Sequence, residues 1–190
     1  MIFYTLSSTY KYTQGEICMN TNWKNNFFFE LAVEDLKASE LNFDNKMPEG
    51  YIFIYFHQYL VRFYLDDCFF EEKNKKFIII TSSMMKPLAL FYFQRFSNIY
   101  SIMDATDSLH NIISRVREIH QNKKRRLFCK INVTALTWIE FKILSMRLSG
   151  NRTSYIATSL NIPIKKIYWH DKVLTKKIGV RKLYQLILSY

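Results

Sequence analysis

Four side chains near the C-terminal end of the chain have the types and spacing needed to bind a polyanion. They lie four, three and four residues apart, in the order Lys165, Trp169, Lys172 and Lys176. In an α-helix this spacing places them on one face, with Tyr168 beside them. A lysine ammonium can pair with phosphate or donate to guanine O6 and N7, and an aromatic edge can contact the thymine methyl group. The pattern favours a DNA-binding helix face; the alternative is that Trp169 or Tyr168 packs on the core.

The rest of this helix and the one before it can be predicted from local signals. The apolar positions that are spaced to pack inward are Ile167, Leu174 and Ile178, with Ile164 at the rim. Pro163 is expected at the first helical position, where its missing N–H costs nothing, and Gly179 is expected to end the helix. A shorter helix is expected over Thr153–Leu160, followed by a turn at Asn161 and Ile162.

Two further helices complete the predicted C-terminal domain. Thr137 and Glu140 have the spacing of a capping box, which predicts a helix start, and Gly150 is expected to stop that helix. Its buried stripe is expected to consist of Ile139, Ile143, Leu144 and Leu148. A last helix is expected over Arg181–Tyr190. The sequence therefore predicts an all-α, four-helix domain over residues 136–190.

Positive charge is concentrated at this end of the chain. Residues 1–120 contain 12 Lys and Arg against 14 Asp and Glu, whereas residues 121–190 contain 15 against 2. A mildly acidic part joined to a strongly basic one predicts a regulatory domain over residues 1–120 and a polyanion-binding domain over residues 136–190. Residues 121–135 are basic and lack helical periodicity, so they are interpreted as a linker. Its Lys123–Arg126 cluster either lies against phosphates or faces solvent.

The first 120 residues alternate β-like runs with helical stretches, which predicts a parallel sheet flanked by helices. The expected strands are Ile2–Leu6, Tyr51–Phe56, Phe77–Thr81 and Ile99–Met103. The expected helices are Glu30–Leu41, Gln58–Glu72 and Asp107–Gln121. The last helix is amphipathic, with Asp107 or Ser108 as its N-cap. Residues 20–30 and 84–97 fit either a strand or a helix.

The C-terminal motifs carry a resemblance to a known family. In chain order they are L-T-x-x-E, L-x-x-x-x-x-G, I-A-x-x-L-x-I, K-x-I-x-x-H and K-K-I-G-V, all within Leu136–Tyr190. This pattern resembles the LuxR/NarL (FixJ) helix-turn-helix. The resemblance implies base contacts from Tyr168, Trp169 and Lys172, and further DNA contacts from Lys165, Lys166, His170 and Lys176. It also implies a dimerisation surface on the last helix, formed by Leu183, Leu186, Ile187 and Tyr190.

The chain departs from the family pattern at four positions of this domain. Ile139, Pro163 and Lys166 replace the usual Arg, Ser and Thr. Asp171 adds a carboxylate to the helix that faces DNA. Close to phosphates it would weaken binding unless it accepts from a cytosine amino group or pairs with a neighbouring lysine. These differences predict that the chain recognises an operator sequence of its own.

NarL-type proteins often carry a phosphorylated receiver domain, and the N-terminal pattern is similar to one. A receiver needs an acidic cluster after its first strand and an Asp at the end of its third, but Ser7-Ser8 and His57 stand there. The strand Ile99–Met103 leads to Asp104 where the family has a Lys. Because the carboxylates that would hold Mg²⁺ are missing, phosphorylation of an aspartate is not expected. The resemblance therefore implies a degenerate receiver without a phosphorylation site.

Other classes of function find little support. No catalytic constellation, glycine-rich phosphate loop or metal-ligand spacing is present, so neither an enzyme, a metal site nor a cofactor is expected. Cys18, Cys68 and Cys129 are odd in number and widely spaced, which fits a reducing cytoplasm. No apolar run has the length of a membrane span, and no signal peptide is recognised. We expect a bacterial, cytoplasmic DNA-binding transcription regulator, associated with the nucleoid when bound to promoter DNA as a homodimer or heterodimer. The alternative is a co-regulator that pairs with another family member through its N-terminal domain.

Overall fold

The computed structural model describes residues 51–65, 70–122, 126–127 and 133–186. Within these residues four parallel strands form one sheet in the order β1-β2-β3-β4. The strands are β1 (Tyr51–Phe56), β2 (Lys76–Thr81), β3 (Ile99–Asp104) and β4 (Arg126–Leu127). Five of the six residues of β2 are buried, as expected for an uninterrupted apolar strand that is covered on both faces. The three strands predicted within the described residues are confirmed.

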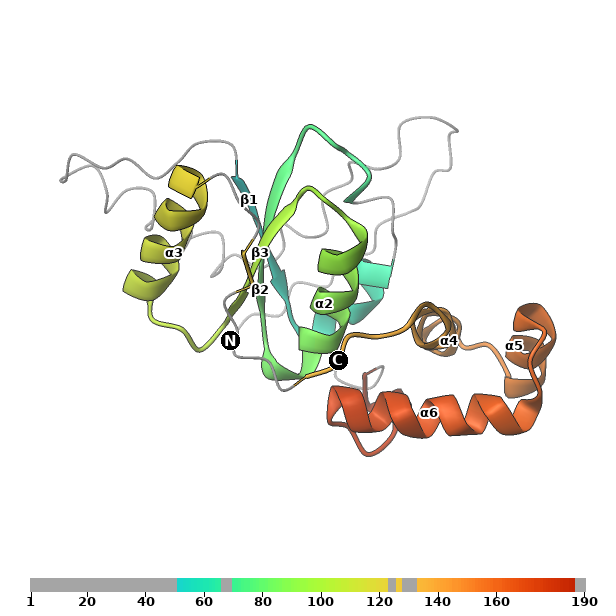
Figure 1. The fold of residues 1–190 in the computed structure, drawn as a ribbon. Helices are drawn as coiled ribbons and strands as arrows, with labels where there is room; N and C mark the ends of the chain where they lie inside the picture. Colours follow the sequence, from blue (N-terminus) through green and yellow to red (C-terminus); the bar gives the residue numbers. More distant parts are fainter. Residues whose placement is uncertain (1–50, 66–69, 123–125, 128–132, 187–190) are drawn as a thin grey trace, which may run out of the picture.

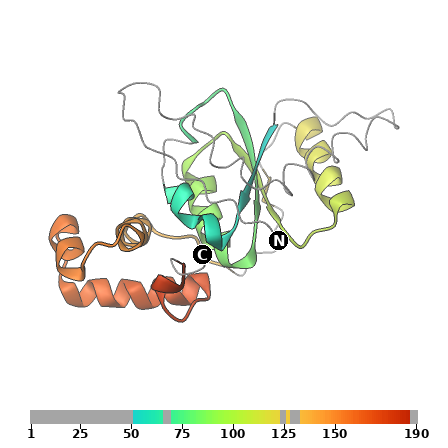
Figure 2. The ribbon, with the colours of Figure 1, turned by 180° about the vertical axis from the view of Figure 1, so that it is seen from behind.

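Helical elements cover both faces of the sheet (Figures 1 and 2). On one face lie the 3₁₀ helix η4 (Gln58–Leu65), the short η6 (Ser83–Met85) and α2 (Lys86–Arg95). On the other face α3 (Leu109–Asn122) buries Ile112, Val116 and Ile119 against the sheet. Ser108 is its N-cap, since the Ser108 carbonyl accepts the first helical bond from Ile112. The predicted parallel α/β architecture is confirmed.

Two details differ from the prediction, and one choice that the sequence left open is resolved. The segment predicted as a helix over Gln58–Glu72 is a 3₁₀ helix over Gln58–Leu65, and Glu71 and Glu72 lie outside any helix. Three aromatic residues and one valine in Gln58–Leu65 favour the α-helix weakly. Residues 84–97, which fitted strand or helix, contain α2. Part of the segment interpreted as a linker, Arg126–Leu127, pairs with β3 as an edge strand. The predicted strand Ile2–Leu6 and helix Glu30–Leu41 lie outside the described residues.

The C-terminal part is helical, as predicted. It consists of α4 (Trp138–Leu148), α5 (Thr153–Leu160), α6 (Ile164–Ile178) and the 3₁₀ turn η7 (Leu183–Leu186). The capping box at the start of α4 is formed. The Glu140 backbone donates to Thr137 Oγ1 over 3.3 Å, and the Thr137 backbone donates to Glu140 Oε2 over 2.7 Å. The predicted last helix, Arg181–Tyr190, is described only up to residue 186, where η7 is a single 3₁₀ turn.

The predicted buried stripe of α4 is wrong at one position. Ile143, Leu144 and Leu148 are buried, but Ile139 is 43% exposed. Phe141 and Glu140 occupy the buried side in its place. The reason is that α4 packs against α6 on one side and toward α2 on another, so its buried face is turned away from Ile139.

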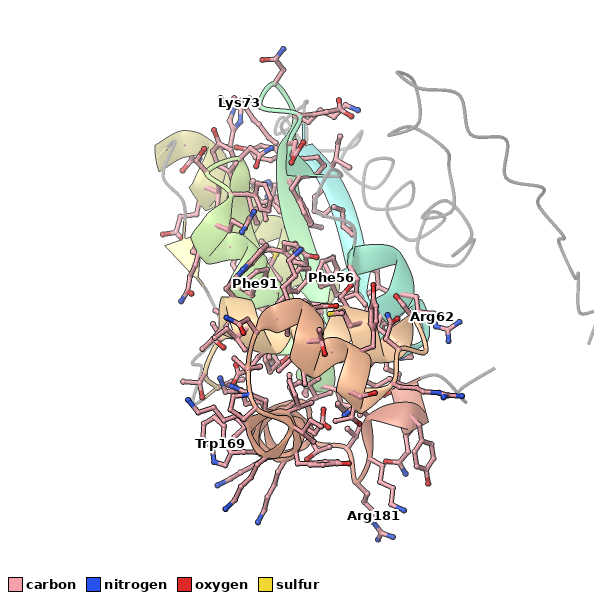
Figure 3. The ribbon with its side chains drawn as sticks, turned by 90° about the vertical axis from the view of Figure 1, so that its right-hand side faces the viewer. Phe56, Arg62, Lys73, Phe91, Trp169 and Arg181 are labelled. Atoms are coloured by element: carbon pink, nitrogen blue, oxygen red, sulfur yellow. The ribbon has the colours of Figure 1, made fainter. Side chains whose placement is uncertain are left out.

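The two parts of the chain share one hydrophobic core. Phe141 of α4 stacks on Phe91 of α2, with ring centroids 4.5 Å apart and an interplanar angle of 16°. Tyr92 meets the same Phe141 ring edge-on at 5.7 Å. The Leu136 backbone also donates to the Pro87 carbonyl over 3.1 Å. Figure 3 shows Phe91 at this junction, between the sheet and the C-terminal helices. Since apolar burial on both sides is continuous, α4 is anchored to the α/β part.

A buried ion pair holds α4 to the last turn of α6. Glu140 is 3% exposed, and its Oε2 accepts from Lys177 Nζ over 2.7 Å. Lys177 also donates to the Ala135 carbonyl over 2.9 Å. Burial alone would raise the pKa of Glu140, but the Lys177 hydrogen bond and charge and the Thr137 backbone N–H lower it below its ordinary value. The ionised form is therefore favoured by folding.

This ion pair predicts a specific dependence of stability on pH. A carboxyl whose pKa is lowered by folding stabilises the fold above its unfolded pKa, and the effect is lost as pH falls through the folded pKa. We expect Glu140→Gln to lower the free energy of unfolding by about 1–3 kcal/mol near pH 7, because Lys177 loses a charged hydrogen-bond partner. Near pH 3 the difference from wild type should shrink. Urea unfolding at both pH values measures it, and an equal difference at both would contradict the assigned role.

Candidate nucleic-acid interface

Helix α6 separates into two faces, as the sequence predicts. Ile167, Leu174 and Ile178 are buried. The exposed side chains on the helix include Lys165, Lys166, Tyr168, Trp169, Lys172 and Lys176. Tyr168 and Trp169 are each 60% exposed, which excludes the alternative that either ring packs on the core.

Four residues with helical spacing form the centre of the exposed face of α6. At about 100° per residue, Lys165, Trp169, Lys172 and Lys176 fall within roughly 60° of one another and opposite the buried side chains. They extend over about 16 Å of the helix axis at 1.5 Å per residue. We call these four residues the lysine–tryptophan stripe. Tyr168 lies on one flank of it. Figure 3 views α6 almost along its axis, with Trp169 and nitrogen-tipped side chains pointing away from the sheet.

The loop before α6 sets the direction of the helix. Asn161 ends α5 in the left-handed conformation, with φ of 52°, which Asn adopts more readily than most residues. The Ile162 backbone then donates to the Ala157 carbonyl over 3.0 Å. Ile156 and Ala157 are buried, and α5 contacts α6. Pro163 is the N-cap of α6 and not its first helical residue, so α6 begins one residue later than predicted, at Ile164. Gly179 ends α6 as predicted, with φ of 78°.

Two further residues of α6, Asp171 and His170, are half-buried and lie outside the stripe. Asp171 accepts from Arg147 of α4 through both carboxylate oxygens, at 3.2 and 2.6 Å. Its charge is therefore neutralised within the chain by Arg147, and not by a neighbouring lysine of α6 as the sequence suggested. His170 is half-buried, and its ring meets the Trp169 ring edge-on at 4.8 Å. Its Nδ1 is buried without a hydrogen-bond partner among the described atoms.

The residues implied in dimerisation lie at the end of the described chain. Leu183 and Leu186 are 8% and 3% exposed, and η7 contacts α4, α6 and η4. In this structure both side chains pack within the chain, so a partner subunit could reach them only if η7 left that packing. Ile187 and Tyr190 lie outside the described residues.

At the carboxyl edge of the sheet, polar groups are engaged with one another. Asp104 at the end of β3 forms an ion pair with Lys86 of α2 and accepts from the Thr106 backbone over 2.9 Å. Burial alone would raise the pKa of Asp104. The hydrogen bonds from Lys86 and Thr106 and the charge of Lys86 outweigh burial, so the pKa lies below its ordinary value. Buried Thr81 at the end of β2 donates to the Ser82 carbonyl. His57 follows β1, and burial lowers the pKa of its imidazole.

The arrangement of elements defines a class of protein, in which a parallel, receiver-like α/β part is joined to a helix-turn-helix part. The second helix of that part, α6, has one face exposed to solvent. Residues 5–120 match the family model described as the EcpR N-terminal domain. The chain belongs to that family, and EcpR is a LuxR-family regulator. The family and architecture implied by the sequence motifs are thus confirmed.

Comparisons with solved structures cover more of the chain, but the similarity is lower. No curated protein matches the chain in sequence. A structure of two RcsB dimers bound to two parallel DNAs is 16% identical, with 85% of this chain and 89% of that chain covered and a TM-score of 0.44. A complex of the two-component response regulator RcsB with DNA is 17% identical, with 86% and 92% covered and a TM-score of 0.38. The RcsB response regulator of Salmonella typhimurium, at 17% identity, has 86% and 93% covered and a TM-score of 0.30. These likenesses are distant, and the family assignment depends on the sequence match.

Within the described ranges, no helix is long and apolar enough to cross a membrane.

Proposed function

We propose that the chain is a transcription regulator that binds duplex DNA by placing α6 in the major groove. The observation that carries the proposal is the lysine–tryptophan stripe, which lies opposite the buried side of α6 and is open to solvent. An α-helix fits the B-DNA major groove, and helix-turn-helix proteins use their second helix there. Membership of a regulator family supports transcription as the process that the binding serves.

Charge supports the same proposal. Among residues 121–190 only Glu140 and Asp171 are acidic, and each is paired within the chain, Glu140 with Lys177 and Asp171 with Arg147. No carboxylate of α6 is therefore left to repel phosphates. We assign Lys165, Lys166 and Lys176 to phosphate contacts, and Tyr168, Trp169 and Lys172 to base edges. His170 serves as a flanking contact, and residues 136–190 form the DNA-binding domain.

The proposal is tested by selecting DNA from a random library with the full chain and sequencing what is bound. We expect an enriched motif with two-fold symmetry if two copies bind paired half-sites. A variant with Tyr168, Trp169 and Lys172 all replaced by alanine should lose the motif. It should keep its fold, because all three side chains are exposed. Circular dichroism verifies the fold. An identical motif from the variant would show that α6 does not read the sequence.

We also propose that binding does not depend on phosphorylation of an aspartate. The supporting observations are that β1 is followed by His57, not by an aspartate, and that Asp104 forms an ion pair with Lys86. The chain would then act in the bacterial cytoplasm without catalytic activity, controlled by its abundance, a ligand or a partner. Treatment with a small phosphodonor such as acetyl phosphate should leave its DNA affinity unchanged.

A second candidate function is a co-regulator that binds DNA well only with another family member. The burial of Leu183 and Leu186 favours it, because in this structure those leucines are not available to a second copy. The N-terminal domain would then supply the partner surface. Salt-sensitive binding without an enriched motif, in both wild type and triple variant, would favour this function over the first.

A further inference from the structure

Trp169 is the feature of the stripe that charge does not explain. Its indole is 60% exposed in a stripe whose three other members are lysines, with Tyr168 on the flank. Phosphate binding does not require a large apolar ring, and leaving one in water is unfavourable by about 25 cal/mol for each Å² of apolar surface. The position therefore calls for a ligand with an apolar group to cover the ring.

The other tryptophan within the described residues shows what an exposed indole looks like when it has partners in its own chain. Trp138 is 44% exposed, but Arg95 and Lys142 lie over its ring, 4.6 and 4.4 Å from the centroid. The ring also stacks near Phe91 and Phe141. The Trp169 ring instead meets the ring of its neighbour His170 edge-on, at 4.8 Å and 75°.

That contact prepares Trp169 for binding. His170 is half-buried, and its ring lies edge-on against the indole, which limits the space on that side of Trp169. A side chain held in place before binding loses less conformational entropy when it is covered. Lys165 precedes the indole by one helical turn and Lys172 follows it by about one turn. With Lys165 on a phosphate and Lys172 at a neighbouring base edge, the indole between them would be placed against the base edges of the groove.

We propose that Trp169 determines sequence specificity by contacting the C5 methyl group of thymine. This inference depends on the proposed function of α6. In the major groove of unmodified DNA, thymine is the base that presents a methyl group, and an apolar side chain recognises it by excluding water. The hydrated ammonium group of a lysine cannot do this. Trp169 therefore supplies the apolar part of the recognition, and the operator contains a thymine in each half-site opposite the indole.

Replacing thymine by deoxyuridine tests the proposal, since this removes the methyl group and keeps the O4 acceptor. The probe is the most enriched duplex from the selection above, with one thymine replaced at a time. We expect the wild-type Kd to rise about three- to fivefold at one position of each half-site, the value for uncovering one methyl-sized group. A hydrogen bond from the indole N–H to O4 would survive the replacement, so it would leave Kd unchanged.

Variants identify the side chain that responds. Trp169→Ala should bind the thymine and deoxyuridine duplexes equally, whereas Trp169→Phe, which keeps an apolar ring, should retain part of the preference. Tyr184→Ala, which removes a 49% exposed ring outside α6, should leave both the affinity and the preference unchanged. Tyr168→Ala should bind both duplexes more weakly, since Tyr168 is assigned to a base edge, but should retain the preference for thymine.

The outcomes separate this inference from the proposed function. If wild type selects a motif but tolerates deoxyuridine at every position, the inference is overturned and the DNA-binding function stands. If Trp169→Ala keeps the thymine preference, or Tyr168→Ala loses it, another residue reads the methyl group and the inference is again overturned. If no motif is selected, the inference falls together with direct operator reading. Loss of the preference in Trp169→Ala alone supports it.

Discussion

Replacing Lys165, Lys172 and Lys176 together by alanine is expected to raise the Kd for the selected duplex roughly 100-fold or more near physiological salt. The three ammonium groups lie along one exposed stripe of α6. Each phosphate that a lysine neutralises releases counterions and contributes about 0.9 to the slope of log K against log salt. The magnitude of the slope should therefore fall by as much as about 2.7, or by less if Lys172 contacts a base instead of a phosphate. Binding at a series of salt concentrations measures both quantities.

A matched control separates this local effect from a change in total charge. Replacing Arg62, Lys73 and Lys75 also removes three cations, but from the α/β part of the chain; Figure 3 shows Lys73 at the end of the molecule away from Trp169. This variant should change the slope of log K against log salt by less than about 0.9, the contribution of a single phosphate contact. Because the three α6 lysines are exposed, the free energy of unfolding should remain within about 0.5 kcal/mol of wild type in the stripe variant. Equal losses of affinity in the two variants would mean that the chain attracts DNA without placing α6 on it.

The local parts of the fold and site could be predicted because they depend on short-range rules. The spacing of Ile167, Leu174 and Ile178 determines which side of α6 is buried, and hence which side carries Trp169. Gly179 and the Thr137–Glu140 capping box likewise act within one helical turn. Each of these features requires only the periodicity of the helix and the chemistry of its ends.

What could not be predicted depends on which elements meet in space. Arg147 and Asp171 are 24 residues apart, and no local pattern indicates that their helices place them together. Ile139 is exposed and Phe141 is buried because α4 packs toward α2, an arrangement between two predicted domains. The same applies to β4, whose two residues lie in a basic segment and form a strand by pairing with β3. Tertiary packing decides these positions, and local propensity does not.

Phe141→Ala is expected to lower the free energy of unfolding by about 3–5 kcal/mol, the usual cost of deleting a buried aromatic ring. Phe141 is 1% exposed, and its ring contacts both Phe91 and Tyr92 of α2. The variant thus removes an anchor of the C-terminal helices on the α/β part. Phe141→Leu, which keeps most of the apolar volume, should cost less than half as much. Tyr155→Ala, at a position 58% exposed on α5, serves as the control and should stay within about 0.5 kcal/mol.

The form of the transition tests whether the two parts share a core. If they do, wild type unfolds in one step, with the same urea midpoint by circular dichroism and by tryptophan fluorescence. In Phe141→Ala the helical part has lost its main aromatic contact with α2, so it should unfold first, and the two midpoints should separate. If the C-terminal helices already melt independently in wild type, the Phe91–Phe141 stack does not couple the two parts. In that case the α/β part could control DNA binding only by pairing with a partner, which is what the co-regulator function requires.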